Sequence, residues 1–157
     1  MPNLLYMLVS LVYHLALALW IGGAVVLGAF VAPELFRSLP RSQAGGIFGP
    51  ILRRFSRLRL STVVLAVAAA ATKRLLWESH SGNPWIAARW LALTILAAVT
   101  VYEIFSLEPA MAAHRAEMAP EGSVDDHHRL AFMRLHRRSE ALMKVSLVAA
   151  VVAVFLG

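Results

Sequence analysis

The chain has 157 residues, of which 59% are hydrophobic, and it carries a formal net charge of +6 with no cysteine. Soluble domains are about half apolar, so this composition predicts lipid as the surrounding solvent. The missing cysteines exclude disulfides, thiolate metal sites, iron–sulfur clusters and cysteine nucleophiles. The positive charge does not indicate nucleic-acid binding, because the basic residues cluster in short connections between apolar segments, as topology determinants do.

Four apolar segments predict four transmembrane helices, since a span needs about 20 largely apolar residues. We expect these spans at about 4–33, 58–77, 85–108 and 127–156. The fourth apolar run, Leu142 to Leu156, is short and contains Lys144, so its helix is expected to begin near Asp126. Backbone amides in lipid must be satisfied within the chain, which favours helices. The prediction is therefore all-α: one domain forming an integral membrane antiparallel four-helix bundle.

The connections after the first and third spans are rich in arginine. The first contains Arg37, Arg41, Arg53, Arg54, Arg57 and Arg59, and the second contains Arg115, Arg129, Arg134, Arg137 and Arg138. The positive-inside rule places both connections in the cytoplasm and both termini outside, in the cell (inner) membrane. We expect the first connection to form a turn and a short interfacial helix over 42–59, whose arginines contact anionic lipids.

Two histidines on different helices are candidate ligands for a metal. His14 shares a helical face with Ala18, Gly22 and Ala29, and such small residues predict that this face turns into the bundle. It is either a structural histidine bonded to another helix or a cofactor or proton-handling group. His136 is either an interfacial histidine among arginines or a second ligand. Histidines on the first and last helices can ligate haem iron between them, although their different depths would tilt the haem.

The third span carries a line of residues at helical spacing: Arg89, Leu93, Leu96, Thr100 and Glu103. A carboxylate in lipid needs a partner, and the candidates for Glu103 are His136, Arg137 or an arginine of the first connection. Arg89 is expected to extend to the interface, with an anion such as a haem propionate as the alternative. Lys144 is expected to pair with Glu140 at i, i+4 in preference to an axial-ligand role.

Several short motifs resemble a known family. The stretch from His14 to Gly23, followed by Val31–Phe36, resembles the first helix of an uncharacterised bacterial four-span membrane family, a domain of unknown function related to human transmembrane protein two-hundred-five. The stretches Leu107–Met111 and Leu135–Ser139 are similar to that family as well. More distantly, the layout resembles CopD-type copper-resistance proteins and HemJ-type protoporphyrinogen oxidases. The HemJ resemblance implies b-type haem and a functional lysine, with His14 and Lys144 matching by position.

Three functions fit these observations. The first is a haem b protein acting in redox or porphyrin chemistry, with His14 and His136 as ligands, Lys144 as an alternative ligand and nearby arginines such as Arg89 on the propionates. The second is a small transport or metal-tolerance component in which His14, Glu103 and His136 line a polar path. The third is a structural or accessory membrane subunit. The sequence leaves open which applies, whether the protein is an enzyme, and whether it forms a homo-oligomer or joins a larger complex.

Overall fold

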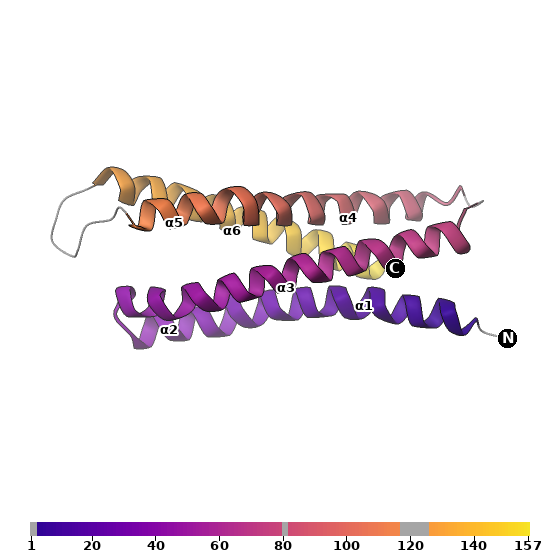
Figure 1. Cartoon of the computed structure of the whole chain (residues 1–157), viewed down its shortest axis with the longest axis horizontal. Helices are drawn as coiled ribbons and strands as arrows, with labels where there is room; N and C mark the ends of the chain where they lie inside the picture. Colours follow the sequence, from indigo (N-terminus) through magenta and orange to yellow (C-terminus); the bar gives the residue numbers. More distant parts are fainter. Residues whose placement is uncertain (1–2, 80–81, 117–125) are drawn as a thin grey trace.

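The computed structural model describes residues 3–79, 82–116 and 126–157, and all regular structure in these residues is helical (Figure 1). The elements are α1 (Leu4–Val25), η1 (Val26–Val31), α2 (Ala32–Ser38), α3 (Arg41–Leu76), α4 (Pro84–Tyr102), η2 (Glu103–Leu107), α5 (Glu108–Ala116) and α6 (Asp126–Phe155). Two of these, η1 and η2, are π-helical turns that continue the α-helices on either side. The chain therefore forms four long antiparallel rods, which are α1 with η1 and α2, then α3, then α4 with η2 and α5, and finally α6. This confirms the predicted all-α four-helix bundle.

The rods pair into two hairpins. The first rod packs most extensively against α3, and α4 packs most extensively against α6. Figure 1 shows the two hairpins close together where the chain termini lie and diverging toward the other end. We call the first of these the tryptophan end, because Trp77 and Trp85 flank the connection there. The other is the arginine-rich end, where the connections after α2 and α5 lie.

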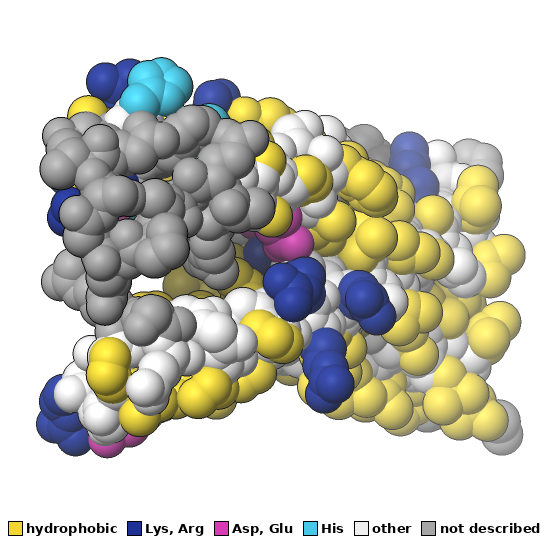
Figure 2. All heavy atoms as spheres, turned by 60° about the vertical axis from the view of Figure 1, so that its left-hand side comes forward, with side chains coloured by type: hydrophobic (Ala, Val, Ile, Leu, Met, Phe, Trp, Pro, Cys, Tyr) yellow, Lys and Arg dark blue, Asp and Glu magenta, His cyan; other side chains and the backbone are white. Residues whose placement is uncertain are grey.

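Three of the rods are long and apolar enough to cross a membrane: Leu4–Ser38, Gln43–Leu76 and Pro84–His114. The first half of α6 is too charged to meet the same standard, so the fourth crossing stays a prediction. Large apolar side chains such as Leu11, Leu19 and Val64 are more than half exposed. Figure 2 shows hydrophobic side chains over the tryptophan half and lysine or arginine side chains toward the arginine-rich half. The protein is therefore an integral membrane protein with an apolar belt around one half of its length.

Helix α3 corrects the prediction of a turn and a short interfacial helix over 42–59. It has 36 residues and continues through Pro50, so it is about 54 Å long. The first turns of α3 pack against α2, where the rings of Phe36 and Phe48 meet edge to face with their centroids 6.2 Å apart. Pro50 cannot donate a backbone hydrogen bond to the preceding turn, yet the helix continues past it. About half of α3 consequently extends beyond a hydrocarbon layer of roughly 30 Å.

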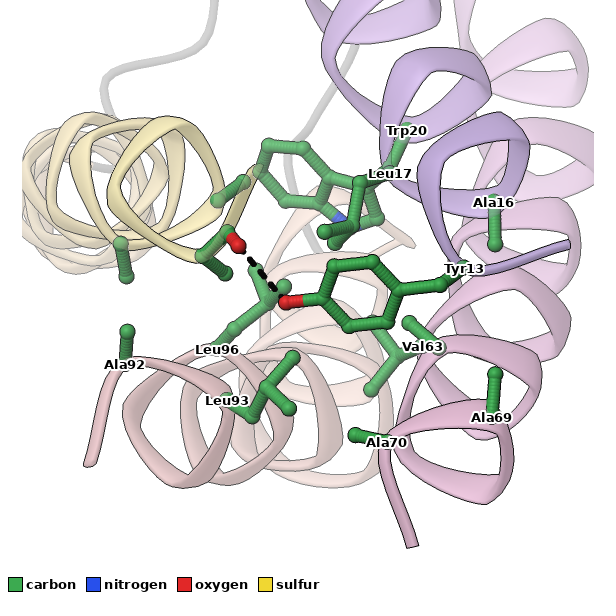
Figure 3. Packing of buried hydrophobic residues seen from close by; sticks show 14 residues of the cluster. Tyr13, Ala16, Leu17, Trp20, Val63, Ala69, Ala70, Ala92, Leu93 and Leu96 are labelled. Carbon is green, nitrogen blue, oxygen red and sulfur yellow. Dashed lines mark hydrogen bonds between the residues drawn. The ribbon is translucent and has the colours of Figure 1, made fainter. Parts of the chain in front are cut away.

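The core lies between the four rods in the tryptophan half (Figure 3). Helix α1 contributes Tyr13, Ala16, Leu17 and Trp20, α3 contributes Val63, Ala66, Ala69 and Ala70, α4 contributes Ala92, Leu93 and Leu96, and α6 contributes Ala149, Ala150 and Ala153. The Tyr13 hydroxyl donates to the backbone oxygen of Ala153 at 2.7 Å and so joins the first rod to the last. The alanines let the helices approach closely.

The face predicted for α1 is wrong. Ala18, Gly22 and Ala29 are exposed, and the helix turns the neighbouring face with Tyr13 and Trp20 into the bundle. Small residues fit a helix contact, but lipid tails accept them equally well. Bulky aromatic rings, which fill the space between the hairpins, decide the rotation of α1 about its axis.

One glycine of α1 lies at a close helix contact. A Cβ atom on Gly23 would lie 2.3 Å from Cε2 of the buried Phe55, whereas one on Gly22 would meet nothing within 4 Å. We expect Gly23→Ala to lower the free energy of unfolding by about 1–3 kcal/mol through overpacking. Gly22→Ala is the matched control and should be neutral or stabilising by up to about 1 kcal/mol, since alanine favours helix. Denaturant unfolding in mixed micelles measures both, and equal effects would contradict the close contact.

Candidate functional site

A buried ion pair joins α3 to the third rod. Arg59 donates from Nη2 to Oε2 of Glu103, and both side chains are 2% exposed. The guanidinium carbon of Arg59 also lies 5.3 Å from the ring centroid of Trp20 and 6.0 Å from that of Phe55. Of the partners expected for Glu103, the structure therefore places an arginine of the first connection beside it.

Further polar groups surround this pair. Ser139 of α6 donates to Oε1 of Glu103 at 3.4 Å. Ser56, one turn before Arg59 on α3, donates to Oε1 of Glu108. We call Ser56, Arg59, Glu103, Glu108 and Ser139 the ion-pair cluster. It connects three of the four rods, so its contacts depend on the arrangement of both hairpins.

The π-turn η2 explains why two carboxylates five residues apart reach the same helix. In an α-helix such residues point about 140° apart. Here the backbone N–H of Glu108 bonds to the backbone oxygen of Glu103, which is the i to i+5 pattern of a π-turn. The wider turn brings both side chains toward α3, where Arg59 and Ser56 receive them. Such π-turns occur frequently at functional sites.

The depth of the cluster in the membrane follows from the position of Arg59 on α3. Arg59 is 17 residues before Leu76, the last residue of α3, which places it about 25 Å from the tryptophan end. A hydrocarbon layer of about 30 Å that begins at the tryptophan end would therefore end close to this pair. The ion-pair cluster thus lies at the boundary between the apolar half and the arginine-rich half.

A layer of buried polar side chains lies next to the ion pair, toward the tryptophan end. Trp20 is seven residues after Tyr13, and Ser146 is seven residues before Ala153, to which Tyr13 is bonded. Seven residues make about two turns, so Trp20 and Ser146 lie at the same depth on antiparallel helices. Thr100 is one turn before Glu103 on α4. We call Trp20, Thr100 and Ser146 the polar layer.

The polar layer lacks hydrogen-bond partners. Trp20 Nε1, Thr100 Oγ1 and Ser146 Oγ are all fully buried, and none has a partner among the described residues. Arg59 Nε, beside them, is in the same condition. A buried polar group without a partner costs about 1–3 kcal/mol, and buried waters usually satisfy such groups. Four of them around one ion pair therefore indicate a site that takes up water or another small ligand.

A second charged cluster lies at the tryptophan end. Arg89 donates from Nη1 to Oε1 of Glu78 at 3.1 Å and also from Nη2 to Oε2. Lys73 is 2% exposed, and its Nζ lies 5.1 Å and 5.6 Å from the ring centroids of Tyr6 and Tyr13. Arg89 was expected to extend to the interface, but it is buried and paired. Glu78 occupies the position predicted for a propionate.

The histidines do not come together. His14 is half-buried and donates from Nδ1 to the backbone oxygen of Ser10 at 2.7 Å, on its own helix. Its Nε2 would lie 3.0 Å from a Cβ on Gly157. His136, with its side chain 58% exposed and 3.6 Å from Glu140, is 21 residues before Gly157. The two histidines are therefore on the order of 30 Å apart along α6.

The other predicted ligands are also separate. Lys144 is exposed and 13 residues before Gly157, which puts it roughly 20 Å from the level of His14. Among the described residues, no three His, Asp or Glu side chains gather as a metal site. One haem iron binds two axial ligands on opposite sides of a single ring. The pairs His14 with His136 and His14 with Lys144 therefore do not fit a haem in this arrangement.

An absorption spectrum tests this conclusion. The two side chains cannot reach one iron, so no haem should depend on both of them. In protein purified from haem-sufficient cells, we therefore expect no Soret band that is lost both in the His14→Ala variant and in the His136→Ala variant. Oxidised and reduced spectra of the three proteins measure this. A Soret band with a sharp reduced α-band that is lost in each of the two single variants would contradict the separation.

The chain was compared with known proteins. Residues 15–120 match the family described as Domain of unknown function (DUF4149). This segment contains both residues of the Arg59–Glu103 pair, together with Trp20 and Thr100. No curated protein and no solved structure matches the chain. Because the match covers about two thirds of the 157 residues, the chain belongs to the DUF4149 family.

Proposed function

We propose that this protein is a small membrane transport component in which the Arg59–Glu103 pair closes a polar path. The polar layer carries this proposal, since its unpartnered groups lie directly beyond the pair. Polar groups inside a membrane protein are costly and commonly mark substrate or ion pathways. A pair that served stability alone would leave no reason for further unpaired polar groups beside it.

The proposed path begins at the arginine-rich end. The positive-inside rule assigns this end to the cytoplasm and both termini to the outside of the cell membrane. The hairpins diverge there (Figure 1), and Figure 2 shows lysine or arginine side chains on this part of the surface. Arg53, Arg54 and Arg57 of α3 are exposed. These arginines would contact anionic lipid headgroups and raise the local concentration of anions near the path.

The apolar core closes the path on its other side. Leu93 and Leu96 of α4 and Leu17 of α1 are at most 1% exposed and separate the polar layer from the cluster at the tryptophan end. The arrangement thus corresponds to a closed state, with one charged cluster on each side of an apolar barrier. A transport cycle would alternate access by moving one hairpin against the other.

The family resemblances of the sequence do not identify a substrate for this path. The proposed relation to transmembrane protein two-hundred-five rests on short motifs in the first, third and last helices. A haem function of the CopD or HemJ type would need a ligand pair other than His14 with His136 or Lys144. The alternative with direct support is the accessory subunit, in which the buried pair only holds helices together.

Single cysteines separate transport from the accessory role, because the natural chain has none. Thr100→Cys and Ser146→Cys would place a thiol in the polar layer. Leu96→Cys and Ala150→Cys are matched controls, since both residues are 0% exposed and lie one turn nearer the tryptophan end. Each variant is exposed to a small membrane-impermeant thiol reagent in sealed vesicles of either orientation.

The proposal expects the two polar-layer cysteines to react from the arginine-rich side and the two controls to stay protected. Equal protection of all four cysteines would favour the accessory subunit, since a purely structural pair needs no water beyond it. Reaction of all four from both sides would show that the apolar barrier is absent.

A further inference from the structure

The unpartnered groups at the ion pair share one chemical property. Trp20 Nε1 and Arg59 Nε carry hydrogen and can only donate. The hydroxyls of Thr100 and Ser146 can donate as well. Figure 3 shows the indole of Trp20 lying across the interior from α1 toward α6, the helix that carries Ser146. All four groups can therefore donate to one hydrogen-bond acceptor placed among them.

We infer that the polar layer and Arg59 bind a small monovalent anion, and that Glu103 takes up a proton when the anion enters. This inference rests on the proposed transport function and names its substrate class. The four donors are at most 2% exposed, so a ligand among them must be small, because protein interiors are closely packed. A halide or a planar anion of the size of nitrate has the required size and accepts hydrogen bonds from all sides.

Charge balance gives the reason for the proton. Charged groups near Glu103 include Arg59 of α3 and Glu108 of α5, with Arg53 near Glu108. Arg138 of α6 lies 5.2 Å from the ring centroid of Tyr102, the residue before Glu103. Helix α6 presents the Ser139 hydroxyl, and α1 presents the uncharged Trp20. The pair is neutral, so an anion entering alone would add an uncompensated buried charge, which is strongly unfavourable. A proton from solvent on a carboxylate oxygen of Glu103 releases Arg59 to the anion and keeps the site neutral.

This coupling predicts the pH dependence of binding. If one proton enters with each anion, the apparent affinity falls about tenfold per pH unit over the range in which binding takes up that proton. Glu103→Gln carries no charge at any pH and leaves Arg59 unpaired. That variant should bind the anion at high pH as well as at low pH.

Iodide quenching of Trp20 tests the inference directly. Trp77, Trp85 and Trp90 are replaced by phenylalanine, which leaves Trp20 as the only tryptophan, and it is excited at a wavelength that tyrosine does not absorb. Sodium iodide is titrated against sodium gluconate at constant sodium concentration, at pH 5 and pH 8. We expect saturable quenching at pH 5, much weaker quenching at pH 8, and saturable quenching at both values in Glu103→Gln.

The controls use the paired amide variant and a second ion pair. Arg59→Gln combined with Glu103→Gln removes both charges without leaving either one unpaired, and it should abolish saturable quenching. Arg37 and Glu34 of α2 form an exposed pair with side chains 78% and 62% exposed. Substituting glutamine for both of these residues should leave the quenching of the Trp20-only protein unchanged.

The outcomes are distinguishable from failure of the transport proposal. Quenching that rises linearly with iodide and persists in the double amide variant would be collisional and would overturn anion binding. Polar-layer cysteines that react, together with absent saturable quenching, would keep the transport path and overturn the anion as its substrate. Protected cysteines and absent quenching would overturn both.

Discussion

Replacing Arg59 with methionine is expected to lower the free energy of unfolding by about 3–5 kcal/mol, because the carboxylate of Glu103 would remain buried without its partner. Glu103 is 2% exposed, and the ion pair is its principal contact in the bundle. The substitution also removes the contact of the guanidinium with the ring of Trp20. Reversible denaturant unfolding in mixed micelles measures the change.

Two further variants show whether the unpaired charge is the cause. The double variant Arg59→Met with Glu103→Leu should recover most of the lost stability, since apolar replacement of a whole buried pair is often neutral. Arg37→Ala breaks the exposed pair with Glu34 and should change stability by no more than about 1 kcal/mol. A double variant as unstable as Arg59→Met would mean that the packing of Arg59, rather than its charge pairing, holds the rods together.

Replacing Trp20 with alanine is expected to cost about 3–5 kcal/mol, the usual range for an aromatic side chain deleted from a close-packed core. The indole is 0% exposed and fills the space between α1 and α6 (Figure 3). In lipid, helix association depends on such packing, because the hydrophobic effect between helices is absent. The same unfolding measurement reports the loss.

Trp85→Ala provides the comparison for Trp20. Trp85 lies at the tryptophan end and is 63% exposed, so its removal leaves no cavity and should cost less than about 1 kcal/mol. Trp20→Phe keeps a ring in the space and should cost clearly less than Trp20→Ala. Equal costs for Trp20→Ala and Trp85→Ala would show that the space around Trp20 can collapse.

The buried face of the third rod was predictable from the sequence. Arg89, Thr100 and Glu103 are polar residues in an apolar helix, so their spacing marks one face. The structure confirms a buried face for Thr100 and Glu103, which are at most 2% exposed, as are Leu93 and Leu96. Arg89 is equally buried, although it was expected to extend to the interface. The alanine face of α3, where Ala66, Ala69 and Ala70 are at most 6% exposed, has a marker of the same kind, because its alanines stand out among leucines and valines.

The first helix offered no such marker. Tyr13, Ala16, Leu17 and Trp20 do follow helical spacing, but nearly every residue around them is also apolar. Periodicity cannot separate a core face from a lipid face when both are hydrophobic. The small residues near His14 were therefore read as the interior, whereas the aromatic rings occupy it.

The centre of the site was only partly predictable. Glu103 stood out as a carboxylate in lipid, but its partner depended on how far α3 extends and on the register between α3 and α4. Arg59 was assigned to a connection and lies in the middle of a continuous helix. The approach of Glu108 depends on the π-turn η2, which no spacing rule for α-helices reveals. The unpartnered donors of the polar layer become visible only in three dimensions.

Because α3 is long, a small tilt at the ion pair produces a larger displacement at the N-terminal end of the helix. From Arg59 to the first residue of the helix, Arg41, there are 18 residues, which form a rigid lever about 27 Å long. If the Arg59–Glu103 contact acts as the fulcrum, a tilt of about 10° would sweep the far tip through roughly 5 Å. Any event that opens this contact would thus be amplified at the surface, where other proteins or lipid headgroups could sense it.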